Sequence, residues 1–498
     1  MSARLVIVFV VDGLRPDAIT ATDAPTLCRL RAEGVEFSNG HAVFPTVTRV
    51  NAATLATGAQ PGTHGILGNQ IYISAADPTR AVDTAAHRRL LEIDRATGGR
   101  LVRTPTLGER LAAHGRRLAA VSSGSTGSAL LTNPRAPSGV GVLVNGYLDP
   151  GQRVAWPDDV SAAILARFGA APPKSGANGH GAAVAWTQRV LREYVLPELG
   201  PDVVINWLTE PDHTQHERGV GSPPARDSLR HADREIAEVL AALNGLGLAS
   251  STDIVVVSDH GFTTNTGGVD VAHELVAAGL MAGGDTGDVV LASSGQAVAV
   301  HVADRGGERI ERISRFVQSR EWGGVLFTAG RGPGDHRGSV AGTFSLELIQ
   351  LASGERSPDL VLTFPWGSKP NAFSVTGSDL ACVSGGARLF ASDHGSMSPW
   401  NIRNTLLCWG PDFKKGVAIA VPAGNADVAP TVLAALGIDG RDGMDGRVLL
   451  EALGGGGDPD GVAVDTVTHS AGDGAYRAAL QISTVGGHRY VDKSWRIA

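Results

Sequence analysis

Aspartate and histidine residues occur together in three short segments of this chain. Asp212 and His216 lie four positions apart, and Asp259 and His260 are adjacent within a Ser-Asp-His-Gly tetrapeptide. His394 lies in a second copy of that tetrapeptide. Zinc prefers imidazole nitrogen and carboxylate oxygen in a roughly tetrahedral shell, and catalytic sites leave one position open. Each segment alone is weak evidence, but together they predict ligands for two transition-metal ions.

Thr48 is the candidate nucleophile of such a site. It lies in the segment 44–51, Phe-Pro-Thr-Val-Thr-Arg-Val-Asn, which leads into an alanine-rich stretch. A threonine hydroxyl is a poor nucleophile at neutral pH unless a metal or an adjacent base lowers its pKa. At a helix N-terminus it would also lie beside free backbone N–H groups, which suit a phosphoryl oxygen. An isolated threonine is more often a helix N-cap, so the role of Thr48 depends on the metal ligands.

Short β-branched runs alternate along the chain with helical stretches rich in alanine and leucine. The candidate strands are residues 4–11, 117–121, 203–208, 253–258 and 405–409. The candidate helices are residues 24–33, 106–114, 180–198, 224–243 and 427–436. Near-continuous apolar strands of this length are typical of a parallel sheet covered by helices on both faces. The pattern therefore predicts an α/β fold with right-handed crossovers.

Three acidic residues follow three of these strands. Asp12 ends the first apolar run, Asp212 lies just beyond the strand at 203–208, and Asp259 follows the strand at 253–258. In open α/β sheets, ligands bind beyond the carboxyl ends of the strands. We therefore expect the three carboxylates to converge on one site by topology alone.

Residues 264–391 interrupt this alternation of strands and helices. The segment is rich in glycine and contains alternating stretches such as 296–302. We interpret it as an inserted, smaller α+β subdomain that covers the site and contributes to substrate binding. Residues 1–263 and 392–498 would then form the α/β metallohydrolase core.

Composition excludes some classes of partner. Lysine and arginine form no dense block and the formal net charge is −7, so we expect no binding of a nucleic-acid duplex. No segment reaches about 18 apolar residues without charge, so no transmembrane helix is expected. Three widely spaced cysteines, Cys28, Cys382 and Cys408, form no disulfide framework. Free thiols suit a reducing compartment, and we expect a cytoplasmic protein.

Seven motifs resemble the alkaline phosphatase superfamily, and within it the nucleotide pyrophosphatase/phosphodiesterase (type I phosphodiesterase) branch. They occur in that family's order, at residues 11–17, 44–48, 57–61, 64–69, 210–216, 258–261 and 393–395. Residues 427–433 are also similar to a helix that is common across the superfamily. The resemblance implies an alkaline-phosphatase-like, doubly wound and mostly parallel central sheet flanked by helices.

The resemblance also implies two Zn²⁺ ions per chain, with Mn²⁺ or another divalent metal as the alternative. Its ligands would be Asp212, His216 and His394 for one ion, and Asp12, Thr48, Asp259 and His260 for the other. Asn69 would donate a hydrogen bond to a non-bridging phosphoryl oxygen. The implied reaction is hydrolysis of a small-molecule phosphate diester by in-line attack of Thr48, through a phospho-threonine intermediate.

Arg49 departs from the pattern of the family, whose diesterases usually have an aromatic residue directly after the nucleophile. Its guanidinium could hold a phosphate dianion or a substrate carboxylate in a bidentate way. A phosphomonoesterase or a phosphonoacetate-hydrolase-like enzyme with Arg49 as anion clamp is therefore the alternative, and a helix-surface arginine is an equal interpretation. In contrast, residues 121–126 lack the cations that monoesterases of the superfamily carry there, which favours diesters.

Two other functions have less support from the sequence. The chain contains no Cys-x-Pro-x-Arg sequence, which a sulfatase would need to make formylglycine, so sulfate-ester hydrolysis is not favoured. A metal-stabilised binding protein that has lost catalysis is a third hypothesis, although every ligand and the nucleophile are present.

Overall fold

A nine-stranded sheet forms the centre of the molecule in the computed structural model, which describes residues 5–149, 151–173, 179–304, 306–383 and 388–497. Its strands lie in the order β21 (Val417–Ile419), β2 (Val35–Phe37), β20 (Leu406–Trp409), β10 (Thr252–Val257), β1 (Leu5–Val11), β9 (Val203–Leu208), β6 (Leu118–Ser122), β7 (Val142–Asn145) and β8 (Ala155–Trp156). Strands β10, β1, β9, β6 and β7 run parallel to one another. The predicted α/β fold with a mostly parallel sheet is confirmed.

All five predicted strands are present, with bounds shifted by at most one residue among those described, and residue 4 lies outside the described residues. The last of them, β20, runs antiparallel to both β10 and β2. An apolar run shows that a strand is buried but not in which direction it runs. The sheet is therefore mixed on this side of β10.

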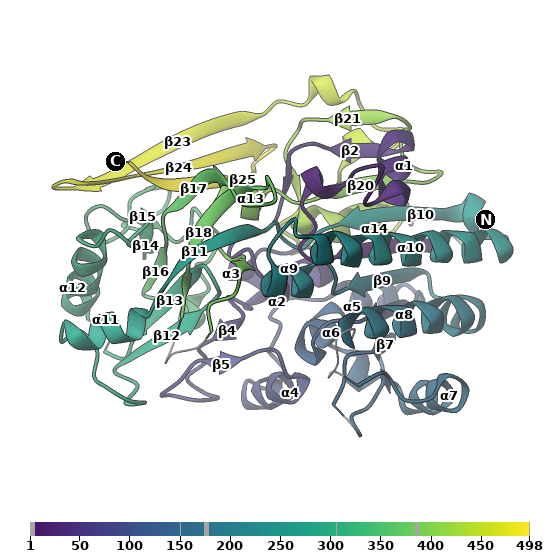
Figure 1. The fold of residues 1–498 in the computed structure, drawn as a ribbon, viewed down its shortest axis with the longest axis horizontal. Helices are drawn as coiled ribbons and strands as arrows, with labels where there is room; N and C mark the ends of the chain where they lie inside the picture. The colour runs from purple at the N-terminus through teal and green to yellow at the C-terminus, as the bar shows by residue number, and fades with distance from the viewer. Residues whose placement is uncertain (1–4, 150, 174–178, 305, 384–387, 498) are drawn as a thin grey trace.

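Helices cover both faces of the central sheet because alternate residues of its strands point to opposite sides. Val8 and Val10 of β1 belong to one apolar cluster, whereas Ile7 and Phe9 belong to the other. The first face carries α2 (Thr48–Thr57), α5 (Leu107–Ala113), α6 (Thr126–Thr132) and α14 (Val428–Ala435). The second face carries α1 (Pro25–Glu33), α7 (Asp158–Phe168), α8 (Gly179–Val190), which continues as a π-helical segment at Leu191–Leu199, and α10 (Pro223–Gly245) (Figure 1). Every residue of β1, β9 and β10 is buried as a result.

The segment after β10 builds two smaller sheets beside the core. One sheet contains β12 (Val289–Ser293), β13 (Ala297–Val302), β16 (Leu360–Thr363), β14 (Leu326–Thr328) and β15 (Phe344–Ser345), and it packs with α11 (Val271–Ala277) and α12 (Gly307–Gln318). The other contains β17 (Trp366–Pro370), β18 (Thr376–Cys382), β11 (Thr263–Val269) and β19 (Ser392–Asp393). In β11, Thr263 pairs with Asp393 of β19, so the chain returns from the inserted segment directly beside the point where it left.

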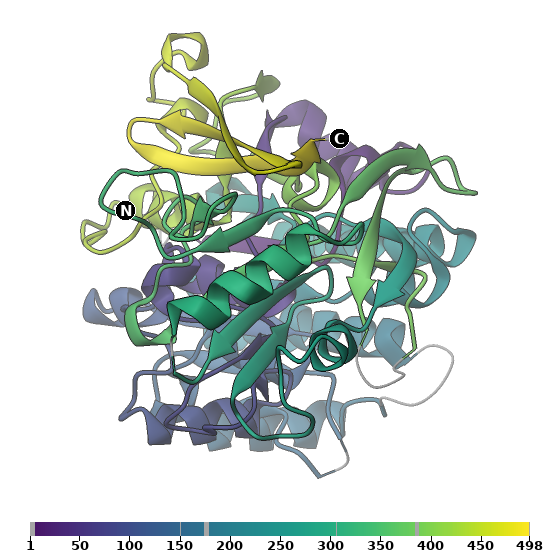
Figure 2. The ribbon, with the colours of Figure 1, turned by 90° about the vertical axis from the view of Figure 1, so that its left-hand side faces the viewer.

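A C-terminal antiparallel sheet of β23 (Asp465–Asp473), β24 (Tyr476–Val485) and β25 (His488–Ile497) lies along the inserted segment (Figure 2). Ala478 and Leu480 of β24 belong to the same apolar cluster as Val300 and Phe327 of the insert. The division into a core of 1–263 and 392–498 and an insert of 264–391 stays a prediction. Among the described residues, no helix combines the length and the apolar character that a membrane span requires.

Candidate active site

The three acids that follow strands lie at one edge of the central sheet. Asp12 directly follows β1, Asp212 begins α9 (Asp212–Arg218) a few residues after β9, and Asp259 follows β10. Because β9, β1 and β10 are adjacent and parallel, their carboxyl ends meet at this edge. The Asp212 backbone N–H donates to the Asp12 carbonyl oxygen at 3.1 Å, which connects two of these strand ends directly.

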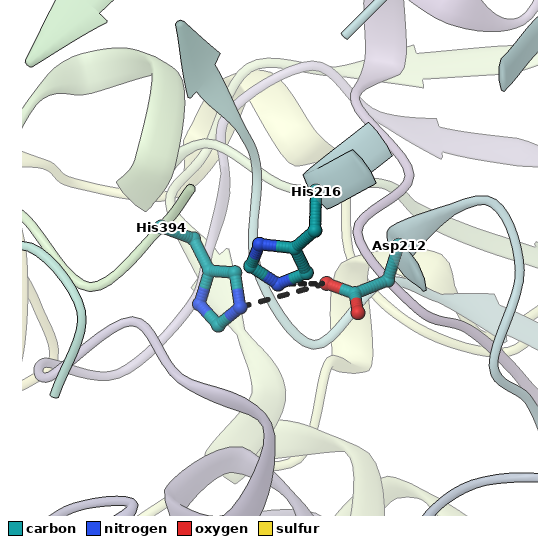
Figure 3. A group of neighbouring side chains, drawn as sticks. All are labelled: Asp212, His216 and His394. Atoms are coloured by element: carbon teal, nitrogen blue, oxygen red, sulfur yellow. Dashed lines mark ion pairs between the residues drawn. The ribbon is translucent and has the colours of Figure 1, made fainter. Parts of the chain in front are cut away.

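Asp212, His216 and His394 form the first of two groups of neighbouring ligand atoms. One turn of α9 separates Asp212 from His216, and the Nε2 atoms of His216 and His394 both lie 3.5 Å from Oδ1 of Asp212 (Figure 3). The Nδ1 atoms of the two imidazoles are hydrogen-bonded to carbonyl oxygens, that of Ser392 at 3.0 Å and that of Thr46 at 2.9 Å. Since a carbonyl oxygen only accepts, each Nδ1 carries a proton and each Nε2 faces Asp212, where it could bind a cation.

Asp12, Asp259 and His260 form the second group. The Nε2 atom of His260 lies 3.1 Å from Oδ2 of Asp259 and 3.5 Å from Oδ1 of Asp12, while its Nδ1 atom bonds the Gly261 carbonyl oxygen at 3.0 Å. The two groups adjoin, because His260 Nε2 is 4.0 Å from Asp212 Oδ1 and the rings of His260 and His394 stack with centroids 3.6 Å apart.

Three buried carboxylate oxygens show that these groups fit cations. Oδ1 of Asp12, Oδ1 of Asp212 and Oδ2 of Asp259 are buried and receive no hydrogen bond within the described part of the chain. The other oxygens of Asp12 and Asp259 are satisfied, by Trp207 Nε1 at 2.9 Å and by the Gly13 N–H at 3.1 Å. An unsatisfied buried acceptor is costly. A divalent cation bound to these oxygens would remove that penalty.

The pKa shifts in the site follow from burial and from the closeness of like charges. Burial and the carboxylates of Asp259 and Asp212 raise the pKa of Asp12 well above its usual value. Burial disfavours the charged form of His216, but the carboxylates of Asp212 and Asp393 and the bond to Ser392 together outweigh burial and raise the pKa of that imidazole to about 9. Burial and the neighbouring His260 hold the pKa of His394 well below its usual value. A bound metal ion would compensate the charge of such a cluster.

Thr48 is the first residue of α2, and its hydroxyl oxygen lies 3.3 Å from His260 Nε2. The Thr48 side chain is half-buried, so it faces the site without being sealed from solvent. The loop before it is held by Asn51, which accepts from the Val43 N–H at 3.0 Å and donates to the Val47 carbonyl oxygen at 3.1 Å. Thr48 therefore joins the second group.

Asn69 and Arg49 line a cavity of about 380 Å³ together with His216, His394 and Phe390. The Arg49 backbone N–H donates to Asn69 Oδ1 at 3.2 Å, which leaves the amide nitrogen of Asn69 as the donor for a bound ligand. Burial lowers the pKa of the Arg49 guanidinium from its usual value, and the carboxylate of Asp83 opposes this shift. The structure thus brings together every residue that the sequence analysis placed in the site.

Two supporting residues were not expected from the sequence. The fully buried indole of Trp207 bonds Asp12, and Asn425 donates both to Asn51 Oδ1 at 2.8 Å and to the Asp259 carbonyl oxygen at 3.0 Å. Asn425 thereby connects the Thr48 loop to the second ligand group. A tryptophan within a strand and an asparagine before a helix are common, so neither carries a signal that sequence inspection could use.

Comparison with known proteins identifies one family and several relatives that are phosphodiesterases. The sequence model of the family described as type I phosphodiesterase / nucleotide pyrophosphatase matches residues 6–372. The venom phosphodiesterase CdcPDE of Crotalus durissus collilineatus is 25% identical over 259 residues, which are 51% of this chain and 26% of the relative. The venom phosphodiesterase of Macrovipera lebetinus is also 25% identical, over 51% of this chain and 25% of its own length. The aligned part of this chain spans only about a quarter of these curated relatives.

Among solved structures, murine ectonucleotide pyrophosphatase / phosphodiesterase 5 has the same fold. An inactive variant of it in complex with AMP matches with a TM-score of 0.59 and 15% identity, over 88% of this chain and 96% of that one. A second structure of the same murine protein gives a TM-score of 0.58 with 14% identity, over 88% and 95%.

Proposed function

This chain belongs to the type I phosphodiesterase / nucleotide pyrophosphatase family, and we propose that it hydrolyses small-molecule phosphate diesters through Thr48. The observation that carries the proposal is the position of the Thr48 hydroxyl, 3.3 Å from His260 in one of two adjoining groups of metal-ligand atoms. A nucleophile beside two cation sites is the arrangement that phosphoryl transfer requires.

The residues of the two groups fit a pair of divalent metal ions. We propose that Asp212, His216 and His394 hold one ion, and that Asp12, Thr48, Asp259 and His260 hold the other. Imidazole makes up nearly half of this ligand set, which favours Zn²⁺ over Mn²⁺, although availability also decides the metal in a cell. When bound, the ions would lower the pKa of the Thr48 hydroxyl and neutralise charge on the attacking and leaving oxygens.

The chain's own residues then perform two displacements at phosphorus. Oγ1 of Thr48 attacks in line, the bond from phosphorus to the leaving oxygen breaks, and a phospho-threonine ester forms. Water next attacks the same phosphorus, and the bond to Thr48 breaks to release the product. The N-terminus of the ten-residue helix α2 and the amide nitrogen of Asn69 would donate to the non-bridging oxygens throughout.

Replacement of Thr48 tests this proposal. We expect Thr48→Ala to abolish hydrolysis of bis-p-nitrophenyl phosphate while elemental analysis still finds about two zinc ions per chain, since the other ligands remain. Thr48→Ser should keep measurable activity because it keeps the hydroxyl. Acid quenching of the wild-type reaction should trap a p-nitrophenyl phosphoryl group on Thr48, because only one p-nitrophenolate leaves in the first displacement. Hydrolysis that survives in Thr48→Ala would contradict the proposal, and a stable phospho-threonine without turnover would support the binding-protein hypothesis instead.

The monoesterase or phosphonoacetate-hydrolase alternative remains because Arg49 lines the same cavity as Asn69 and His394. Arg49 as an anion clamp would need a guanidinium that is free to bind the substrate. Selective loss of monoester or phosphonoacetate hydrolysis in Arg49→Ala, with diester hydrolysis spared, would support it. A cytoplasmic location also stays a proposal, which the three free cysteines support.

A further inference from the structure

Arg49 is held by two neighbours on the wall of the cavity. Its Nε atom donates to Thr84 Oγ1 at 3.1 Å, and its Nη2 atom lies 3.4 Å from Asp83 Oδ1. The Arg49 side chain is only 15% exposed, whereas that of Asp83 is 61% exposed. The guanidinium is therefore fixed in the wall, and the carboxylate that fixes it faces the open side of the cavity.

The backbone that places Asp83 is the same backbone that places Asn69. Strand β4 (Gln70–Ile71) starts directly after Asn69 and pairs with β5 (Val82–Asp83), with Gln70 opposite Asp83. Thr84 then donates through its backbone N–H and its hydroxyl to the Asn69 carbonyl oxygen, at 3.0 Å and 2.7 Å. The backbone of Asp83 is thus held in place relative to Asn69.

Charge on the cavity wall is balanced pairwise. Arg49 is offset by Asp83, and Arg388, the other arginine that lines the cavity, forms an ion pair with Glu217 at 2.9 Å. A phosphate diester carries one negative charge, whereas a monoester carries nearly two at neutral pH because its second pKa is about 6. A wall whose guanidinium groups are already paired with carboxylates contributes little to compensating the second charge.

We propose that Asp83 is a positioning residue that sets specificity: it retains Arg49 and so disfavours phosphomonoester dianions relative to diesters. The inference rests on the proposed function, since it concerns the substrate class of the same site. Without the Asp83 charge, Arg49 could turn both of its terminal nitrogens to the extra phosphate oxygens, as guanidinium groups commonly do.

Asp83→Asn tests the inference with little disturbance of the fold. The asparagine oxygen can still accept from the Ala85 N–H, a bond of 2.6 Å in the native turn. We expect kcat/KM for p-nitrophenyl phosphate to rise by about tenfold relative to kcat/KM for bis-p-nitrophenyl phosphate, the scale of one charge interaction in a partly exposed site. Asp83→Glu keeps the charge and should keep the native ratio. Asp335→Asn is the matched control, because Asp335 also pairs with an arginine, Arg337, but does not line the cavity.

A double-mutant cycle shows whether the effect passes through Arg49. In an Arg49→Gln background, Asp83→Asn should leave the monoester-to-diester ratio unchanged, because no guanidinium remains to be released. An equal gain in both backgrounds would overturn the inference, as would an unchanged ratio in Asp83→Asn alone. These results differ from failure of the proposed function, which would appear as hydrolysis that does not depend on Thr48 in the wild-type background.

Discussion

The side chain of Asn51 should stabilise the fold and position the nucleophile at the same time. It is fully buried in α2, and Asn51→Ala would remove the acceptor of two buried donors, the Val43 N–H and the Asn425 amide. Each donor left without a partner costs roughly 1–3 kcal/mol, so the free energy of unfolding should fall by about 4 kcal/mol. The Val47 carbonyl oxygen keeps its helical bond from the Asn51 N–H and adds little to this loss.

Urea denaturation measures the stability change, and kcat/KM for a diester measures the effect on the loop that carries Thr48. Asn51→Asp should recover part of the stability because it keeps an acceptor for Val43, whereas Asn244→Ala, an exposed change in α10, should alter stability by less than about 0.5 kcal/mol. Asn425→Ala and Asn51→Ala should be markedly non-additive, since each removes the same bond. A stability loss in Asn51→Ala no larger than that of Asn244→Ala would refute the reasoning.

Two further predictions concern the surroundings of single buried residues. Trp207→Phe should weaken zinc binding about 10- to 100-fold, measured in competition with a chelator, because Asp12 loses the donor that orients it. Trp409→Phe is the control: it removes only an indole bond to Glu33 and should leave zinc binding unchanged. Burial and the Arg356 charge lower the pKa of His64 in the folded protein to about 3. In the unfolded chain the pKa of a histidine is about 6.5, so below that pH the unfolded state binds one proton more than the folded state. The free energy of unfolding therefore falls as the pH falls. Between pH 7 and 5.5 the wild type should therefore lose about 1.2 kcal/mol more stability than His64→Gln, and equal losses in urea titrations would contradict this.

The clustering of the candidate metal ligands was predictable because their chemistry and their place in the chain coincide. Asp12, Asp212 and Asp259 each follow an apolar strand, and the parallel order of three adjacent strands is enough to bring them to one edge. The bounds of the strands were also predictable from the sequence. A strand that is buried on both faces, such as 203–208, appears as a continuous β-branched and apolar run.

The contacts of Arg49 were not predictable, because they depend on β4 and β5, which have two residues each. Strands this short leave no periodic signal, and their register is fixed by tertiary contacts on either side. The C-terminal sheet was missed for a different reason: its first strand, β23, is largely exposed and therefore lacks the apolar alternation that marks a half-buried strand.

The position of His394 depends on the core and the insert together. Its loop is held from the core by Thr46, whose carbonyl oxygen bonds His394 Nδ1 and whose hydroxyl oxygen accepts from the Gly395 N–H at 3.1 Å. Asn401 accepts from the same N–H at 3.2 Å, and its amide nitrogen donates to Oε1 of Gln296, a residue of the insert, at 3.1 Å. His394 is thus held by both parts of the chain. Its Nε2 atom lies 3.5 Å from Oδ1 of Asp212, as does that of His216. Any movement of the insert relative to the sheet would therefore displace His394 from Asp212 and His216 and so change the first group directly.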